Sequence, residues 1–289
     1  MISIMIIGNG PAGISAGIYA KRTGLDVTII GKDSGALQKA DKVENYYGFS
    51  EPIKGVDLVL NGIKQAKRLG ITIINEEVIS IEFNEDYIIK TDKNEYMAKA
   101  VVLATGSPRQ VPKIAGIKEY EGKGVSYCAV CDAFFYKGKN VAVLGCCDYA
   151  MNEARELLNV ANSVTIITDG VLPKGNIPKE AKVIEKQVAR IQGDIVVQSV
   201  IFKDDSELKI DGLFIAYGVA GSSEFALKLG VLMENNRIIV NENMETNLPG
   251  LFAAGDCIGG IYQIAKAVYD GSRAGMASSK YVRLISTVK

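Results

Sequence analysis

The sequence has no histidine and no tryptophan among its 289 residues. The absence of histidine excludes His-based catalytic triads, histidine general bases and histidine metal ligands, so acid–base chemistry must use carboxylates, lysine, tyrosine or cysteine. Charge of one sign is also missing, since 33 lysines and arginines balance 33 aspartates and glutamates. With no basic run either, there is no electrostatic case for nucleic-acid binding.

Long apolar runs are absent as well. No stretch approaches the roughly 20 residues that span a bilayer, which predicts no membrane insertion. The apolar start MISIMIIGNG lacks a basic n-region and runs into a glycine turn, which is typical of a buried strand and not of a signal peptide. We therefore expect a cytoplasmic protein, in which a cysteine pair is more often catalytic or metal-binding than a static link.

A strand, a glycine turn and a helix open the chain. Residues 2–7 form a continuous apolar run that ends at Gly8-Asn9-Gly10-Pro11-Ala12-Gly13, and residues 26–30 read as a second buried strand. The G-x-G-x-x-G spacing between a strand and a helix indicates a dinucleotide pyrophosphate site, because such a ligand requires bare backbone amides at a helix N-terminus. A tight turn without a ligand is the plainer alternative.

The pattern recurs once. Residues 140–145 predict a strand, 146–160 a helix and 163–168 another strand. Residues 71–99 alternate apolar and polar side chains, which predicts an antiparallel meander with turns at 84–85 and 93–94 that leads into a strand over 100–106, and a comparable meander follows the second unit. Residues 250–260 precede a long helix over 261–284. The expected fold class is α/β, with two Rossmann-like (three-layer ββα) dinucleotide-binding-type domains.

The stretch VSYCAVCDAFFY contains Cys128 and Cys131 followed by Asp132. A structural zinc site needs four ligands, and this chain offers one C-x-x-C and no histidine, so zinc is disfavoured and no metal is expected. A redox dithiol suits the short spacing, because the disulfide closes within the motif and the thiolate is activated there. The remaining cysteines, at 146, 147 and 257, are interpreted as core or turn residues.

At this point the chain resembles the thioredoxin reductase family of flavoproteins over nearly its whole length. The resemblance is carried by five segments, GNGPAG, KVENYYGF, ATGSPR, GVSYCAVCDAFFY and LPGLFAAGDC. It implies bound FAD, thioredoxin as the substrate and a homodimer. It also implies an FAD-binding domain made of residues 1–111 and 239–289, with a redox domain of residues 112–238 inserted in it.

The same resemblance implies roles for single residues. Cys131 is the flavin-proximal sulfur, Cys128 attacks the disulfide of the partner, and Asp132 delivers a proton to the departing thiolate. Asp256 reaches the ribityl chain and Gln263 the isoalloxazine edge; helix capping is the plainer reading of both aspartates. The residues expected to bind FAD are Gly8, Gly10, Pro11, Ala12, Gly13, Leu37, Asn45, Val78, Ala104, Thr105, Gly106, Gly255, Asp256 and Gln263.

The chain departs from the NADPH-dependent members in the inserted domain. Their GGGDSA turn is here GCCDYA, in which Cys147 crowds the phosphate path and Tyr149 replaces a small residue. No arginine follows the next strand to pair with a 2′-phosphate. We therefore expect that NADPH use is lost. Asp169 leaves open an alternative in which an acidic side chain holds the 2′-hydroxyl of NADH.

The resemblance extends to the clostridial ferredoxin-dependent flavin thioredoxin reductases. Reduced ferredoxins near −400 mV and thioredoxin near −270 mV differ by about 130 mV, or roughly 6 kcal/mol for two electrons. The expected function is an FAD-dependent enzyme that passes electrons from ferredoxin through Cys128 and Cys131 to thioredoxin. The alternatives are an NADH-dependent thioredoxin or glutaredoxin-like reductase, a donor to a peroxide-reducing partner, and a redox-sensing flavoprotein without turnover.

Overall fold

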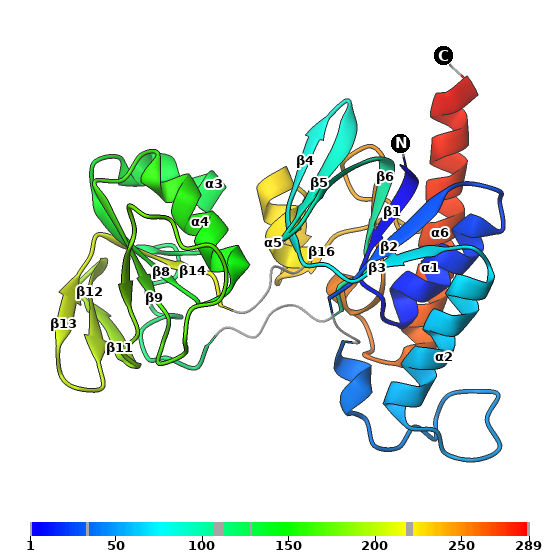
Figure 1. The fold of residues 1–289 in the computed structure, drawn as a ribbon, viewed down its shortest axis with the longest axis horizontal. Helices are drawn as coiled ribbons and strands as arrows, with labels where there is room; N and C mark the ends of the chain where they lie inside the picture. The colour runs from blue at the N-terminus through cyan, green and yellow to red at the C-terminus, as the bar shows by residue number, and fades with distance from the viewer. Residues whose placement is uncertain (1, 33–34, 107–111, 128, 218–221, 288–289) are drawn as a thin grey trace. The chain divides into compact units, whose positions relative to one another are not determined.

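The chain forms two compact units, one inserted in the other (Figure 1). The computed structural model describes residues 2–32, 35–106, 112–127, 129–217 and 222–287. Unit 1 comprises residues 1–109 and 221–289, and unit 2 comprises residues 110–220. This arrangement confirms the predicted α/β class, with a discontinuous first unit and a continuous second one.

Unit 1 is built on a mixed seven-stranded sheet. Its strand order is β3-β2-β1-β6-β5-β4, and β17 pairs with β6 outside this path. The parallel half pairs β1 with β2 and β6, while residues 78–99 of the predicted meander form the antiparallel half with its turns near residues 84–85 and 93–94. The start of that predicted meander, residues 72–74, instead pairs in parallel with β2. The strands are β1 (Ile2–Ile7), β2 (Val27–Ile30), β3 (Thr72–Ile74), β4 (Val78–Asn84), β5 (Asp86–Thr91), β6 (Glu95–Leu103) and β17 (Leu251–Ala253).

Two helices far apart in sequence, α1 and α6, lie side by side in unit 1 (Figure 1). Their close approach depends on small residues, since a Cβ at Gly271 would overlap the backbone of Ala12, and one at Gly275 that of Ala16. The helices of unit 1 are α1 (Pro11–Lys21), α2 (Gly55–Arg68), α5 (Ser222–Leu229) and α6 (Ile264–Thr287), with 3-10 turns η1 (Ala36–Lys39) and η3 (Gly255–Ile258).

The boundary after unit 2 differs from the expected one. Residues 222–238, which were expected in the inserted domain, belong to unit 1. The reason is packing: α5 contacts β4, and the short hairpin of β15 (Met233–Glu234) and β16 (Arg237–Ile238) contacts α5 and η3. An amphipathic eight-residue helix after a buried strand gave no signal of which domain it joins.

Unit 2 contains a parallel five-stranded sheet in the order β10-β9-β8-β14-β7. A separate antiparallel sheet, β11-β12-β13, corresponds to the second predicted meander. That meander was expected to begin near residue 181, but residues 182–184 instead extend the parallel sheet. The strands are β7 (Val125–Ser126), β8 (Asn140–Leu144), β9 (Ser163–Ile167), β10 (Lys182–Ile184), β11 (Val188–Gly193), β12 (Val197–Phe202), β13 (Glu207–Lys209) and β14 (Gly212–Ile215). Its helices are α3 (Ala129–Asp132), η2 (Ala133–Tyr136) and α4 (Asp148–Leu158).

Both predicted βαβ units are present, with boundaries within about two residues of the expected ones. Helix α2 was not predicted, because the loop before it carries no strong start signal. Within the described ranges, no helix is both long and apolar enough to cross a membrane.

Candidate functional site

The glycine turn after β1 contains glycines of two kinds. Gly8 has φ +115°, and a Cβ there would overlap the Ala104 carbonyl; a Cβ at Gly13 would overlap the Gly8 carbonyl. The fold itself therefore requires both. Gly10 has φ −74°, which any residue adopts, and a Cβ there would meet nothing within 4 Å. Packing inside the protein gives no reason for glycine at position 10, so the open space beside it is suited to a ligand.

Helix α1 begins at this open space. Gly10 is its N-cap, no side chain caps the helix, and Pro11 occupies its first turn. The backbone N–H groups of the first turn are consequently available, and the helix dipole favours an anion there. The arrangement fits the pyrophosphate of a dinucleotide.

The end of β6 lies against the turn. Ala104 is buried and its N–H donates to the Ile7 carbonyl at 2.8 Å. The next residue, Thr105, is fixed by Ser222: the two hydroxyl oxygens are 2.7 Å apart, and the Ser222 N–H donates to Thr105 Oγ1 at 2.7 Å. Gly106 has φ +86° with open space around it. Ser222 was not predicted from the sequence, because its partner is 117 residues away.

Asn45 and Gln263 are brought together although they are 218 residues apart in sequence. Asn45 Nδ2 donates to Gln263 Oε1 at 2.9 Å. Both side chains are exposed, one in the loop before α2 and the other just before α6. The resemblance predicted both to lie beside the flavin, and the fold makes them neighbours.

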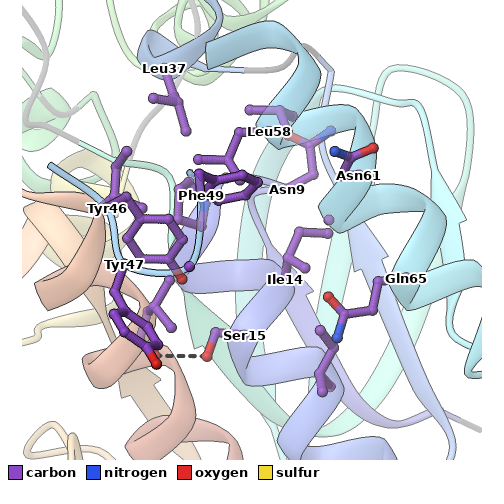
Figure 2. Close-up of a pocket in the computed structure, with 18 of the residues that line it drawn as sticks. Asn9, Ile14, Ser15, Leu37, Tyr46, Tyr47, Phe49, Leu58, Asn61 and Gln65 are labelled. Atoms are coloured by element: carbon purple, nitrogen blue, oxygen red, sulfur yellow. Dashed lines mark hydrogen bonds between the residues drawn. The ribbon is translucent and has the colours of Figure 1, made fainter. Parts of the chain in front are cut away.

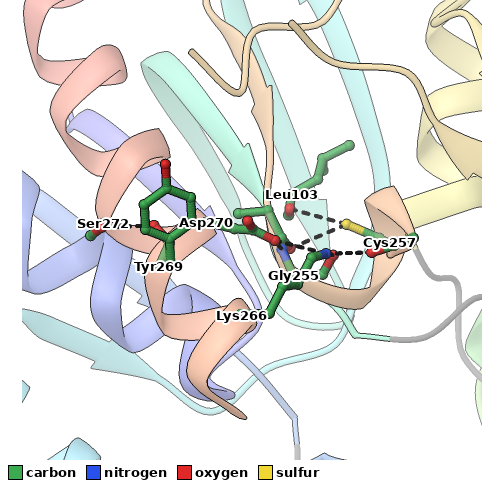
Figure 3. A network of polar contacts seen from close by, with 9 residues as sticks. Leu103, Gly255, Cys257, Lys266, Tyr269, Asp270 and Ser272 are labelled. Carbon is green, nitrogen blue, oxygen red and sulfur yellow. Dashed lines mark hydrogen bonds and ion pairs between the residues drawn. The ribbon is translucent and has the colours of Figure 1, made fainter. Parts of the chain in front are cut away.

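Asp256 lies in η3, which a buried polar network holds in place (Figure 3). Lys266 Nζ donates to the Gly255 carbonyl at 2.7 Å and also to the Gly259 carbonyl, and it pairs with Asp270 Oδ2 at 2.7 Å. Asp270 Oδ2 in turn accepts from the Gly255 N–H at 3.2 Å. The ion pair thus fixes both ends of the turn that presents Asp256, a function that the sequence alone did not reveal.

Cys257 belongs to the core. It is fully buried, and its thiol lies 3.5 Å from the Leu103 carbonyl and 3.3 Å from the Ala254 carbonyl. Burial raises the pKa of the Cys257 thiol to about 11. A thiol with that pKa is a poor nucleophile near neutral pH, in keeping with the assignment of no catalytic role.

A cavity of about 440 Å³ extends from the glycine turn between α1, α2, α6 and the loop before α2. Gly10, Pro11 and Leu37 line it together with aromatic side chains of that loop (Figure 2). Its volume is within the range of small-molecule sites. Leu37 and the glycine turn therefore face one cavity.

The far end of the predicted FAD site contains Val78, buried at the start of β4. Its neighbour Glu77 is buried and forms an ion pair with Lys32, which follows β2. Gly31 follows β2 directly, where the general dinucleotide fingerprint has an acidic residue. A Cβ there would lie 2.6 Å from Asn9 Cγ, so a side chain at position 31 would require the Asn9 side chain to move.

In unit 2, Cys128 lies outside the described residues, and so does the side chain of Cys131. Asp132 is described: its Oδ2 accepts a hydrogen bond from Ser126 Oγ at 2.6 Å. Burial, and then the charge of Asp132, raise the pKa of Tyr136. The hydrogen bond between Ser126 and Asp132 thus joins the residues on either side of the cysteine pair.

The turn after β8 is the counterpart of the glycine turn. A Cβ at Gly145 would overlap the Ala216 carbonyl, so this glycine is required by packing on β14. Cys147 is the N-cap of α4 and makes no side-chain capping bond. The segment of residues 171–176 lies against this helix start, since the Lys174 N–H donates to the Cys146 carbonyl at 2.6 Å. Its Asn176 carbonyl accepts a hydrogen bond from Arg155 in the last turn of α4.

Two further residues singled out near this turn are Tyr149 and Asp169. The side chain of Tyr149 is fully buried, so it does not crowd a phosphate at the surface. Asp169 Oδ1 accepts from the Val188 N–H at 2.7 Å. Burial, and then Asp169, raise the pKa of Tyr217. The Asp169 carboxylate is thus engaged within unit 2.

A glycine turn at the start of a helix, next to a cavity and facing the ends of β6 and β17, in a chain of two Rossmann-like units, defines the class of dinucleotide-binding oxidoreductases. The family model of pyridine nucleotide-disulphide oxidoreductases matches residues 2–271. The chain belongs to this family and, within it, to the thioredoxin reductases. It is therefore a flavin disulfide oxidoreductase with FAD as its cofactor.

Several relatives are known. The thioredoxin reductase of Aquifex aeolicus is 33% identical over 96% of this chain and 93% of its own length. The atypical thioredoxin reductase TRi of Desulfovibrio vulgaris Hildenborough is 37% identical, with a TM-score of 0.92 over 98% of this chain and 99% of that one. A ferredoxin-flavin thioredoxin reductase of Clostridium acetobutylicum is 34% identical, with a TM-score of 0.72 over 99% and 98%.

Proposed function

We propose that this chain reduces thioredoxin through the Cys128–Cys131 dithiol and takes its electrons from reduced ferredoxin. In the balanced reaction, two reduced ferredoxins and two protons convert one thioredoxin disulfide to its dithiol. FAD, when bound, supplies the exchange between one-electron donors and a two-electron acceptor. The residues of the glycine turn would hold its pyrophosphate, and Asp256, Asn45 and Gln263 would hold its flavin end.

The observation that carries the choice of donor is the start of α4. A pyridine nucleotide needs open backbone amides at such a turn, with glycines that let the phosphates approach. Here Cys147 stands at the N-cap, and the segment of residues 171–176 lies against the helix start through the bond between Lys174 and Cys146. This packing supports a donor that needs no nucleotide groove. The Clostridium acetobutylicum relative, by its name a ferredoxin-flavin thioredoxin reductase, is consistent with it.

The use of NADH as the donor would depend on Asp169. A ribose hydroxyl would have to compete with the Val188 N–H, which already donates to this carboxylate at 2.7 Å. That competition weakens the case for NADH. A role for Asp169 in binding NADH would also leave the obstruction at Cys147 in place. Ferredoxin is therefore the better-supported donor.

On the thiol side, Cys128 would attack the disulfide of thioredoxin, and Cys131 would then close the enzyme disulfide and release the product. The displaced thiolate needs a proton, and Asp132 is the carboxyl group next to the pair in sequence. Ser126, which donates to Asp132 at 2.6 Å, would hold that carboxyl group in place. We further propose that the enzyme works as a homodimer in the cytoplasm, where the thiols are kept reduced.

Anaerobic stopped-flow mixing tests the donor. Oxidised holoenzyme is mixed separately with NADPH, NADH and a reduced clostridial-type ferredoxin, and the flavin absorbance is followed. Of the three donors, only ferredoxin is expected to bleach the flavin. Direct reduction by dithionite is the positive control. Rapid bleaching by either nucleotide, or none by ferredoxin, would refute the proposed donor. Reduction of a peroxide-reducing partner in place of thioredoxin would refute the proposed substrate, and flavin reduction without turnover would indicate a redox sensor.

Two exposed phenylalanines next to the redox segment are expected to contact thioredoxin. The Phe134 and Phe135 side chains are 79% and 68% exposed, whereas Tyr136 beside them packs edge-on against Phe214. Aromatic side chains, phenylalanine among them, are enriched in the core of protein–protein interfaces relative to the rest of the surface. Replacing both by serine should raise the KM for thioredoxin roughly tenfold. Flavin reduction by ferredoxin should not change.

The matched control for this double variant is Ile195→Ser. Ile195 is 76% exposed on the same unit, in the turn between β11 and β12. Its KM for thioredoxin should equal that of the wild type. If the Phe134/Phe135 variant behaves like the Ile195 control, the docking role of the two phenylalanines is wrong.

A further inference from the structure

Helix α4 contacts the backbone on both sides of Cys128. Glu153 Oε2 accepts a hydrogen bond from the Ala129 N–H at 2.8 Å. Tyr149 Oη lies 3.4 Å from the Tyr127 carbonyl and donates to it. The two side chains are four residues apart on α4, so they project from the same face of the helix. The residues immediately before and after Cys128 are thus bonded to one rigid element.

Both side chains are buried, at 1% exposure for Glu153 and 0% for Tyr149. A buried carboxylate is costly unless hydrogen bonds offset its desolvation, and a buried phenol likewise needs a partner. Their bonds to the redox segment therefore help to offset the cost of placing these groups in the interior. Residue 149 must also be long, because a serine or alanine at this position would not reach the Tyr127 carbonyl.

Helix α4 contacts two different segments of unit 2. The segment of residues 171–176 lies against the start of this helix, where a nucleotide phosphate would bind, since the Lys174 N–H donates to the Cys146 carbonyl at 2.6 Å. Tyr149 in the first turn of the same helix and Glu153 one turn later face the segment that carries the cysteine pair, in keeping with the contact between α3 and α4. Ser126 and Asp132 close that segment from within.

We propose that Glu153 and Tyr149 are positioning residues that hold the backbone around Cys128 and so favour closure of the Cys128–Cys131 disulfide. The proposal rests on the proposed function, in which this pair cycles between dithiol and disulfide. Fixing the backbone raises the effective concentration of one sulfur at the other, which stabilises the internal disulfide relative to the dithiol and to a mixed disulfide with a partner.

The test measures the dithiol–disulfide equilibrium without ferredoxin or thioredoxin. Holoenzyme is equilibrated with mixtures of reduced and oxidised glutathione, quenched with acid, alkylated, and analysed by mass spectrometry. At equilibrium, each enzyme disulfide that forms passes two electrons and two protons to one oxidised glutathione, which becomes two reduced molecules. Glu153→Ala should shift the equilibrium about tenfold or more towards the dithiol. Tyr149→Phe should shift it about threefold.

Two further variants separate positioning from general stability. Glu153→Gln keeps an acceptor oxygen for the Ala129 N–H and should recover most of the wild-type equilibrium. Glu156→Gln removes a partly exposed carboxylate from the same helix, one turn further from the redox segment, and should leave the equilibrium unchanged. The FAD content, set by unit 1, should be the same in all four variants.

Equilibria within twofold of the wild type for both Tyr149→Phe and Glu153→Ala would overturn the positioning role. If Glu153→Ala does not fold, Tyr149→Phe and Glu153→Gln decide in its place: a wild-type equilibrium in Tyr149→Phe overturns the proposal. Failure of the proposed function gives a different result, because a wild-type protein whose Cys128 and Cys131 never form a disulfide would contradict the relay itself.

Discussion

Replacing Cys131 with serine is expected to lower thioredoxin reduction by roughly a thousandfold or more while leaving FAD bound. In the proposed relay, Cys131 closes the enzyme disulfide and takes electrons from the flavin side. A serine hydroxyl cannot form that disulfide, so each turnover would stop at the mixed disulfide between Cys128 and thioredoxin. The measurement is steady-state thioredoxin reduction with reduced ferredoxin as donor, together with the flavin absorption spectrum.

The Cys128→Ser variant is the companion to this experiment. Cys131→Ser should trap thioredoxin covalently, visible as a thiol-sensitive band on a non-reducing gel, whereas Cys128→Ser should trap none. Full activity of Cys131→Ser would refute the relay. Trapping by Cys128→Ser in place of Cys131→Ser would reverse the roles of the two cysteines.

Replacing Gly10 with valine is expected to weaken FAD binding by roughly a hundredfold or more while weakening the fold only slightly. In the structure, position 10 has a φ that any residue adopts and open space for a side chain. A Cβ there meets no protein atom within 4 Å, and a valine side chain would occupy the space that the pyrophosphate needs. The measurement is FAD affinity, from recovery of free-flavin fluorescence on dilution.

The control for Gly10→Val is thermal unfolding of the FAD-free protein. Without FAD the variant should unfold only slightly below the wild type, because valine is a poorer helix N-cap than glycine. With FAD the difference should become much larger, because binding to the native state raises its stability. Gly8→Ala should behave differently, losing stability even without FAD, since its φ is +115° and its Cβ would overlap the Ala104 carbonyl. Unchanged FAD affinity in Gly10→Val would show that the pyrophosphate lies elsewhere.

Local patterns in the sequence predicted much of this structure. The strand at 2–7, the glycine turn and the helix after it depend on neighbours in the chain, and each was predicted from such neighbours. The turns near Glu85 and Lys93 follow from the alternation of apolar and polar residues. The resemblance to a family placed Asn45 and Gln263 each beside the flavin, but the hydrogen bond between them was not predicted, because no local rule joins residues 218 positions apart.

What the sequence did not predict are bonds between distant segments. Ser222 holds Thr105, Lys266 and Asp270 hold the turn at Asp256, and Glu153 holds the Ala129 N–H. Each of these residues looks like an ordinary helix residue in its own segment. The place of Tyr149 was not predicted for the same reason: the sequence showed only that it replaces a small residue, whereas packing directs its ring into the core.

The discontinuity of unit 1 also governs the order in which the protein can fold during synthesis. The partners of α1 and β6 include α6 and β17, which are translated after the whole of unit 2. Unit 2 is one continuous stretch and can close as soon as it has left the ribosome, since domains generally fold as units. The segment that starts the chain must therefore wait, with the apolar face of α1 uncovered, until the last helix arrives. FAD can gain its full set of contacts in unit 1 only at that point. Unit 2 can therefore be folded before unit 1 is able to bind the flavin.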